Sequence, residues 1–221
     1  MMDSAIKQYR DNLCIVIQGP INNVYLKKIK RKYKKSNIPT IFSTWRGEES
    51  KFKKKDIALF NELVEVTGVQ NIMLQQHSTY RGLLEAKKMG YKYAIKIRSD
   101  MVFTDLEKFL KLDIDYNKLN FLYFLNYVRE DHGSKHYKYL CDYIQISSVD
   151  NLIDLWNFKN DVNCTFAEEL LTNNYLKLNN KDNISFFGNM LSEECDIFWF
   201  KNNLYLNELR NDKKYKTKMI I

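Results

Sequence analysis

Residues 13–20 of this chain read LCIVIQGP. Five consecutive apolar residues, three of them β-branched, are typical of a strand buried inside a parallel sheet. The next three residues, Gln18, Gly19 and Pro20, favour a loop directly after the strand. The stretch therefore predicts the first strand of an α/β fold.

Helical and strand patterns alternate after this strand. The helical pattern over 23–35 has Val24, Ile29 and Tyr33 as apolar positions among lysine and arginine. The other predicted elements are a strand over 40–45, a helix after the charged stretch 48–55, a short strand around 63–66, a helix over 71–89 and a strand over 91–98. This alternation predicts a mixed, mainly parallel sheet flanked by helices, in a Rossmann-like arrangement.

The second half of the chain has a less regular pattern. It predicts strands over 120–128, 139–146 and 197–200, and helices over 151–158 and 166–176. No linker composition separates the halves, so residues 1–221 are interpreted as a single domain. We expect two functional halves within it, about 10–105 and about 106–221.

The composition is that of an ordinary globular protein. Hydrophobic residues make up 45% of the 221 positions and charged residues 28%, which excludes disordered and fibrous chains. No window approaches the roughly 18 apolar residues of a membrane span, and the start lacks a secretory signal pattern, so a cytoplasmic protein is expected. The four scattered cysteines are expected to be reduced packing residues.

The chain is basic, with a formal net charge of +8. Such a charge favours an anionic partner. Three classes of partner remain open on charge alone: a nucleotide diphosphate, an anionic lipid surface and a nucleic acid.

Polar residues follow three of the predicted strands. They are Gln18-Gly19-Pro20, Ser43-Thr44-Trp45-Arg46 and Arg98-Ser99-Asp100. Ligands of open α/β sheets bind beyond the carboxyl ends of the strands. Amides and hydroxyls, one aromatic ring for a base and cations for phosphate are therefore expected at one edge. The candidate cofactor-binding set also includes Lys96, a basic residue inside the fourth strand.

Asp100 is the candidate metal ligand. A carboxylate at the end of a buried strand is placed to hold a divalent cation that bridges a diphosphate. It could equally cap the following turn or pair with Arg98, which occupies the first position of what would otherwise be a D-x-D motif.

A polar stripe marks one face of the helix over 71–89. Gln75, Ser78, Thr79 and Gly82 recur at spacings of three and four. The stripe could face a bound nucleotide sugar, or it could be an ordinary solvated face.

Three acids in the second half are candidate catalytic residues. Asp142 stands alone in an apolar strand pattern, so it needs a partner, either a substrate hydroxyl or backbone groups. Glu168 and Glu169 open a helix, where acids also stabilise the helix dipole. His132 and His136 lie four apart, but Gly133 between them favours a loop rather than a metal site.

Several motifs, in order, resemble the WavE lipopolysaccharide-synthesis family, whose members are treated as GT-A-like glycosyltransferases. They are Q-G-P-I at 18–21, S-T-W-R-G-E at 43–48, N-I-M-L-Q-Q-H-S-T-Y-R-G-L at 71–83 and K-I-R-S-D-M at 96–101. The likeness continues more thinly at 141–143 with 152–156, and at 167–169. Leu74 stands where the family usually has arginine, and Ala167 where it has proline.

The resemblance implies a GT-A-like fold and a sugar-nucleotide donor bound over the first half of the chain. Asp100 would lie near Mn²⁺ or Mg²⁺. A glycan or lipid-linked glycan of the lipopolysaccharide or capsule type would be the acceptor, bound by the second half. An inverting enzyme would need a general base, with Glu168, Glu169 and Asp142 as candidates in that order.

Other functions remain open. A sugar nucleotidyltransferase would normally carry a glycine-rich phosphate loop, which Gln18-Gly19-Pro20 is not. The basic runs at 27–35 and 213–218 suggest a nucleic-acid-binding module, although a lysine-rich helix face is by default solvated, and no nucleic acid is expected as a partner. The same runs could hold the protein at the inner face of an anionic membrane.

Overall fold

The computed structural model describes residues 9–103, 106–110, 114–122, 140–159, 164, 167–178, 184–187 and 206–208. The predictions for residues 123–128 and 197–200, the loop with His132 and His136, and the basic run 213–218 lie outside these residues.

A seven-stranded sheet forms the centre of the fold, with strand order β3-β2-β1-β4-β7-β6-β8. Its strands are β1 (Leu13–Gln18), β2 (Thr40–Trp45), β3 (Ile57–Asn61), β4 (Tyr93–Arg98), β6 (Leu119–Leu122), β7 (Ile144–Ser148) and β8 (Ile184–Phe187). Two further strands, β5 (Met101–Phe103) and β9 (Leu206–Glu208), pair antiparallel in a separate small sheet.

The large sheet is mainly parallel. β3, β2, β1 and β4 run parallel to one another, and β6 pairs parallel with β8. β7 is antiparallel to both of its neighbours, β4 and β6. The prediction of a mixed, mainly parallel α/β sheet is confirmed, and the arrangement is compatible with a Rossmann-like fold.

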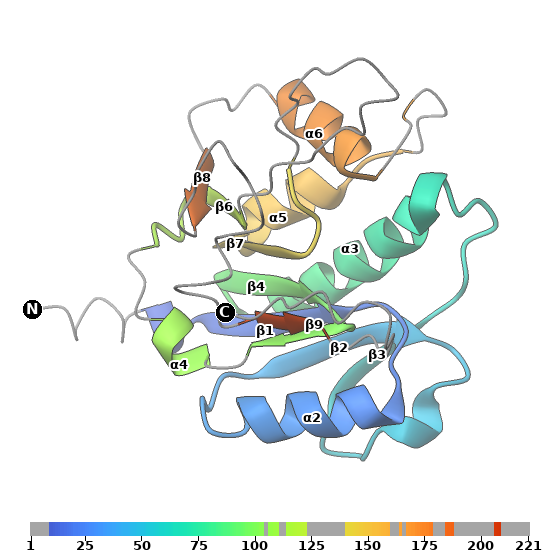
Figure 1. Ribbon diagram of the computed structural model, residues 1–221, viewed down its shortest axis with the longest axis vertical. Coiled ribbons are helices and arrows are strands. Elements are labelled where there is room, and N and C mark those ends of the chain that lie inside the picture. Colours follow the sequence, from blue (N-terminus) through green and yellow to red (C-terminus); the bar gives the residue numbers. More distant parts are fainter. Residues whose placement is uncertain are drawn as a thin grey trace, which may run out of the picture.

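Helices cover both faces of this sheet. The helical elements are α2 (Asn23–Tyr33), α3 (Ile72–Lys88), α4 (Leu106–Phe109), α5 (Val149–Trp156), α6 (Ala167–Lys177) and the 3₁₀ turns η1 (Glu49–Lys51) and η2 (Val69–Asn71). α2 lies on one face, and α3 and α5 lie on the other with α6 beyond them (Figure 1). The sheet therefore has a buried core on each side.

Alternate residues of β1 divide between the two cores. Ile15 and Ile17 belong to the core under α2, where Leu26, Ile29 and Tyr33 of that helix are also buried. Cys14 and Val16 belong to the core under α3. A strand buried on both faces has to be apolar at every position, which is why residues 13–17 read as a continuous apolar run.

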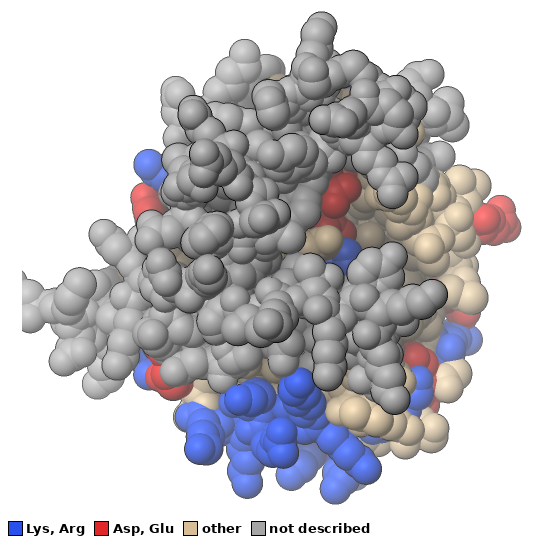
Figure 2. All heavy atoms as spheres, in the orientation of Figure 1, with Lys and Arg blue, Asp and Glu red and all other residues tan. Residues whose placement is uncertain are grey.

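The outer face of α2 carries the basic run. Lys27, Arg31, Lys34 and Lys35 are exposed, and Figure 2 shows Lys and Arg side chains gathered along the side of the molecule where α2 lies. The apolar positions differ from the prediction, because Val24 is 61% exposed and Leu26 points inward instead.

The polar stripe of α3 is packed against the sheet. Ser78, Thr79 and Gly82 are buried. A Cβ on Gly82 would lie 2.6 Å from Cγ1 of Val16 and 3.0 Å from Cβ of Ser43, so the glycine allows the helix to approach β1 and β2 closely. The interpretation of this stripe as a solvated face is wrong.

The third strand is the main error of the sequence prediction. Residues 57–61 form β3, where a helix was expected, and they pair parallel with β2. The strand expected around 63–66 is absent, and Leu63 and Val66 are 70% and 59% exposed. The apolar run Ile57 to Phe60 is long enough to pair with β2, and the chain then leaves the sheet.

Within the described residues, none of the helices is both long and apolar enough to cross a membrane. Cys14, Cys141 and Cys164 are buried thiols, as expected for packing residues.

Candidate functional site

A cavity of about 770 Å³ opens at the carboxyl ends of β1 and β4. This volume is within the range of small-molecule sites. The lining residues are Gln18, Gly19, Pro20, Ile21, Asn22 and Tyr25 after β1, Trp45, Glu48 and Lys51 after β2, Gln70, Asn71, Leu74 and Gln75 at the start of α3, and Arg98, Ser99 and Asp100 after β4.

The strand order explains why a cavity forms here. β1 and β4 are neighbours, but the chain continues from β1 toward β2 and β3 and from β4 toward β7 on the other side. Connections that leave adjacent strands in opposite directions create a crevice at their carboxyl ends. In the register, Gln18 pairs with Arg98, so both strands end at the same level.

The loop after β1 is fixed by the loop after β4. The Ser99 N–H donates to the Gln18 carbonyl at 2.8 Å, and the Ser99 hydroxyl donates to the Pro20 carbonyl at 2.6 Å. Gly19 has φ +106°, and a Cβ there would lie 3.1 Å from Oγ of Ser99. Gly19 is thus needed both for its backbone conformation and for the close approach of the two loops.

Glu48 fixes the same loop from the opposite wall. Its carboxylate accepts the Ile21 N–H at 3.1 and 3.2 Å, the Lys51 ammonium at 2.6 Å and the Thr44 hydroxyl. Lys51 also donates to the Ile21 carbonyl at 2.6 Å. Thr44, expected to bind the cofactor, is fully buried and serves this network rather than lining the cavity.

The sequence analysis missed Glu48 and Lys51 as cavity residues. Glu48 is the last residue of the S-T-W-R-G-E motif, and this position could have indicated a cavity residue. Lys51 belongs to a charged stretch whose other lysines, such as Lys53, are exposed, so its type alone gave no signal.

Two helices begin at the cavity. The α2 N-cap is Asn22, whose side chain accepts the Val24 N–H at 2.8 Å, and α3 begins after Asn71. Helix N-termini present free N–H groups and the positive end of the helix dipole. Gln70 and Asn71 have φ +50° and +61°, a left-handed conformation that costs about 1–3 kcal/mol in a non-glycine residue and clusters at functional sites.

Two aromatic rings line the cavity. Trp45 is only 8% exposed and stacks on His77, with ring centroids 6.4 Å apart and planes 14° apart. Tyr25 is half-buried on α2. Trp45 was the expected stacking residue for a base, and Tyr25 is a second ring in reach of the cavity that the sequence analysis did not select.

Gln75 is the part of the α3 stripe that reaches the cavity. Its Oε1 is buried and has no hydrogen-bond partner among the described residues. The Ser78 hydroxyl lies 3.1 Å from the Gln18 side chain, so Gln18 connects α3 to β1. Thr79 is buried and does not line the cavity, and its hydroxyl has no partner in the described part of the chain.

Arg98 joins two acids at the edge of the cavity. Its Nε donates to Asp100 at 3.0 Å and Nη2 donates to the second oxygen of Asp100 at 2.8 Å. Nη1 lies 3.4 Å from Oδ2 of Asp142, and the guanidinium lies 4.9 Å from the Tyr143 ring centroid. Asp142 is 1% exposed. Its Oδ2 pairs with Arg98, and its Oδ1 is buried with no hydrogen-bond partner among the described residues.

Lys96 lies deeper than expected. Its ammonium is fully buried, donates to the Asp142 carbonyl and lies 4.6 Å from the Trp156 ring centroid. Burial lowers the pKa of Lys96 to about 8. Lys96 does not line the cavity, and its ammonium contacts the Asp142 carbonyl and the Trp156 ring instead.

The start of α6 approaches the cavity wall. The Ala167 N–H donates to Oε1 of Gln70 at 3.2 Å, which places Glu168 next to the residues at the start of α3. Burial, and after it the negative charge of Asp142, raise the pKa of Glu168. Glu169 is half-buried on the same turn.

The described residues fit a divalent cation poorly. No group of three or more His, Cys, Asp and Glu side chains comes together in the described part of the chain. Asp100, the predicted ligand, gives both carboxylate oxygens to Arg98. The pairing of Asp100 with Arg98, which the sequence left open, is confirmed.

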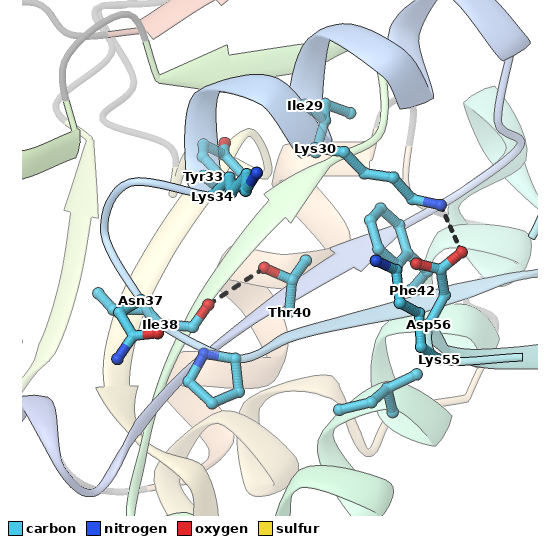
Figure 3. Close-up of a pocket in the computed structure, with 12 residues that line it drawn as sticks. Ile29, Lys30, Tyr33, Lys34, Asn37, Ile38, Thr40, Phe42, Lys55 and Asp56 are labelled. Atoms are coloured by element: carbon cyan, nitrogen blue, oxygen red, sulfur yellow. Dashed lines mark hydrogen bonds and ion pairs between the residues drawn. The ribbon is translucent and has the colours of Figure 1, made fainter. Parts of the chain in front are cut away.

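A second, smaller cavity of about 460 Å³ lies at the amino end of β2 (Figure 3). Lys30 spans it to reach Asp56 at 2.5 Å, and Ile38, Phe42 and Tyr33 line it. It lies at the edge of the sheet opposite to the ligand-binding edge, and none of the predicted catalytic, cofactor-binding or metal-binding residues lines it.

No protein-family model matches the sequence, and a search of curated proteins finds no match.

Proposed function

We propose that this chain is a GT-A-like glycosyltransferase that transfers a sugar from a nucleotide-sugar donor to a surface glycan of the lipopolysaccharide or capsule type. The cavity at the carboxyl ends of β1 and β4 carries this proposal. It combines the size of a nucleotide-sugar site, two helix N-termini and an arginine at its edge, which together favour an anionic ligand.

The lining residues suggest how a donor would bind. The diphosphate lies toward Arg98 and the starts of α2 and α3. The base packs on Tyr25 or on the exposed edge of Trp45, and the unpartnered Oε1 of Gln75 accepts a hydrogen bond from a ribose or sugar hydroxyl. Gln18, Gly19 and Pro20 shape the wall between these parts.

Glu168 is the preferred general base. Burial and Asp142 raise its pKa toward the working range of such a base. The oxygen of an acceptor hydroxyl attacks the anomeric carbon, the bond from that carbon to the diphosphate oxygen breaks, and Glu168 takes the hydroxyl proton. Asp142 is committed to Arg98, so it acts as a positioning residue, and Glu169 is the second candidate base.

The resemblance to the WavE family supports the same interpretation. All four motifs of the first half contribute residues to the lining of the cavity. These residues are 18–21, Trp45 and Glu48, Asn71, Leu74 and Gln75, and 98–100. Motifs distant in sequence thus meet around one cavity. A sugar nucleotidyltransferase receives less support, because the loop after β1 has only one glycine.

The test is calorimetric binding of UDP, GDP and CMP to the wild-type protein and to Gln75→Leu, with Lys27→Gln on the outer face of α2 as the control. We expect one nucleotide to bind to the wild type and to the control, and to bind Gln75→Leu more weakly. Hydrolysis of the matching nucleotide sugar should follow the same order. If the wild type binds none of the three nucleotides, the proposal is wrong.

A peripheral contact with an anionic membrane at the cytoplasmic side is proposed for the outer face of α2. Residues 27–35 contain seven lysines and arginines and no acid. Sedimentation with vesicles that contain phosphatidylserine should decrease as salt increases and should be lost in a variant with Lys27, Arg31 and Lys34 changed to Gln. Salt-independent binding, or none, would exclude this contact.

A further inference from the structure

We propose that Arg98 is the resident cation of the donor site, and that Asp100 holds this arginine in place rather than holding a divalent metal ion. The inference rests on the proposed function, because it assigns the group that neutralises the departing diphosphate. The carboxylate concerned is that of Asp100, for which the sequence left open metal binding, capping of the following turn and pairing with Arg98.

The geometry at Arg98 is that of an arginine fixed by carboxylates. Asp100 accepts two parallel hydrogen bonds from Nε and Nη2, at 3.0 and 2.8 Å, which is the bidentate arrangement that holds a guanidinium plane in one orientation. The side chains of Arg98 and Asp100 are 15% and 17% exposed, so the pair is largely shielded from water.

A second acid fixes the other end of the guanidinium. Asp142 approaches Nη1 at 3.4 Å from the far side, and its own position is fixed by the buried Lys96, which donates to its carbonyl. The Arg98 N–H donates to the Tyr143 carbonyl at 3.2 Å, and the Tyr143 ring lies against the guanidinium. The arginine is therefore placed before any ligand arrives, which keeps the cost of ordering it out of the binding step.

Part of the guanidinium remains for a ligand. Arginine carries five N–H donors, and the bonds to Asp100 and Asp142 use three of them. Arg98 also lines the cavity, together with Ser99 and with residues at the starts of α2 and α3. Two of its N–H groups have no partner among the described residues and can bind phosphate oxygens of a diphosphate in the cavity while the carboxylates keep their bonds.

Arg98 can perform the role that a metal ion would have in the transfer. As the bond from the anomeric carbon to the diphosphate oxygen breaks, negative charge accumulates on the leaving diphosphate. The N–H groups of Arg98 bind that charge more strongly than they bind the intact donor. No proton has to move at Arg98, since a guanidinium stays protonated throughout.

The test compares binding with and without metal. Inorganic pyrophosphate, UDP and GDP are titrated into the wild type, Arg98→Lys and Asp100→Asn, once with EDTA and once with Mn²⁺. Arg31→Lys on the exposed face of α2 is the matched control for the Arg98 substitution. Thermal melting of each variant checks that it is folded.

We expect the wild type to bind equally well, within about twofold, with EDTA and with Mn²⁺. Arg98→Lys keeps the positive charge but loses the planar guanidinium, which can donate parallel hydrogen bonds. The affinity of this variant for pyrophosphate and the nucleotides should therefore decrease by about tenfold or more under both conditions. Asp100→Asn should lose less than about threefold, because the amide removes a negative charge beside the anion and Asp142 still holds Arg98. Arg31→Lys should match the wild type.

Two other outcomes overturn the inference, and they have different meanings. Binding that appears only with Mn²⁺ and disappears in Asp100→Asn would make Asp100 the metal ligand and leave the proposed function standing. Absence of binding for every probe under both conditions would remove the proposed function together with this inference. If Arg98→Lys does not fold, the EDTA comparison and Asp100→Asn still decide between Arg98 and a metal ion.

Discussion

Two regions of this protein concentrate positive charge in different ways. On the outer face of α2, lysines and arginines follow one another from residue 27 to residue 35 without an acid in the run. At the end of β4, Arg98 and Lys96 are shielded from water, and each contacts Asp142. The same residue types thus occur once as a solvated surface and once as a paired, buried cluster.

The difference shows where charge affects the fold and where it affects partners. Water screens the charges on α2, so removing one of them changes little in the folded chain. The charged groups at the end of β4 are shielded from water and interact with one another. Removing Arg98 therefore leaves the buried carboxylate of Asp142 without its cation.

The largest effect is expected for Arg98→Leu. The substitution leaves the carboxylate of Asp142, which is 1% exposed, without the guanidinium at 3.4 Å. Breaking a buried pair from one side costs about 3–5 kcal/mol, and urea unfolding at neutral pH should show a decrease of that size in the free energy of unfolding.

The double variant Arg98→Leu with Asp142→Leu separates two causes of a stability loss. One is the buried Asp142 carboxylate without its cation, and the other is any further effect of replacing Arg98. Replacing both members of a buried pair by apolar groups is often close to neutral, so the double variant should recover the part of the stability that the single variant loses through Asp142. Asp100, which is 17% exposed, still loses its two bonds to Arg98 in both variants. A double variant as unstable as Arg98→Leu would mean that the pair is not the cause of the loss.

Lys96→Met tests the buried ammonium through pH. Folding lowers the pKa of Lys96 from 10.5 to about 8, so between these values the unfolded chain binds more protons than the folded one. The free energy of unfolding of the wild type therefore has a contribution that increases from about pH 8 to about pH 10.5, and Lys96→Met should lack it. Urea unfolding at several pH values in this range measures the difference.

At neutral pH the same substitution should have a smaller effect than Arg98→Leu. The methionine removes a charge that is costly to bury, but it also leaves the Asp142 carbonyl without its donor. The two contributions oppose each other, and the net change should stay within about 2 kcal/mol. Equal pH dependence in the wild type and in Lys96→Met would contradict the lowered pKa.

Glu48 is intermediate between the exposed charges of α2 and the buried charges of β4, and Glu48→Gln tests its contribution to stability. The Glu48 side chain is 14% exposed and accepts hydrogen bonds from Ile21, Thr44 and Lys51. Glutamine keeps one acceptor oxygen and loses the charge, so thermal melting should report a loss of about 1–2 kcal/mol. Glu49→Gln, on the exposed neighbouring residue, is the matched control and should change stability by less than about 0.5 kcal/mol. Equal losses in both variants would contradict the role of Glu48.

The sequence predicted the parts of the fold that depend on local patterns. The apolar run at 13–17, the helical pattern at 23–35 and the strand that ends in Arg98 all lie close to their expected positions. The spacing of apolar residues in these segments indicates the type of element, although Val24 of the helix is exposed. The strand at 57–61 was missed because its pairing with β2, rather than its own pattern, decides its conformation.

The candidate site was predictable as a place but not as a set of contacts. The rule for strand ends placed Gln18, Arg98 and Asp100 at one edge, and all three line the cavity. The rule could not show that Thr44 donates to Glu48, because side-chain partners depend on how separate loops pack. The burial of Thr79 likewise follows from the closeness of α3 to the sheet, which no local pattern encodes.

The smallest effect on stability is expected for the variant with Lys27, Arg31 and Lys34 changed to Gln on α2. These side chains are exposed, and Lys27 and Arg31 are four residues apart, as are Lys30 and Lys34, so each pair repels weakly along the helix. Removing the repulsion should raise the free energy of unfolding by about 0.2–0.5 kcal/mol per pair at low salt, and the gain should vanish at high salt. Urea unfolding at two salt concentrations measures it. A decrease of several kcal/mol in the free energy of unfolding would mean that this face of α2 packs against another part of the chain. The difference between these residues and Arg98 would then no longer be that between exposed and buried charges.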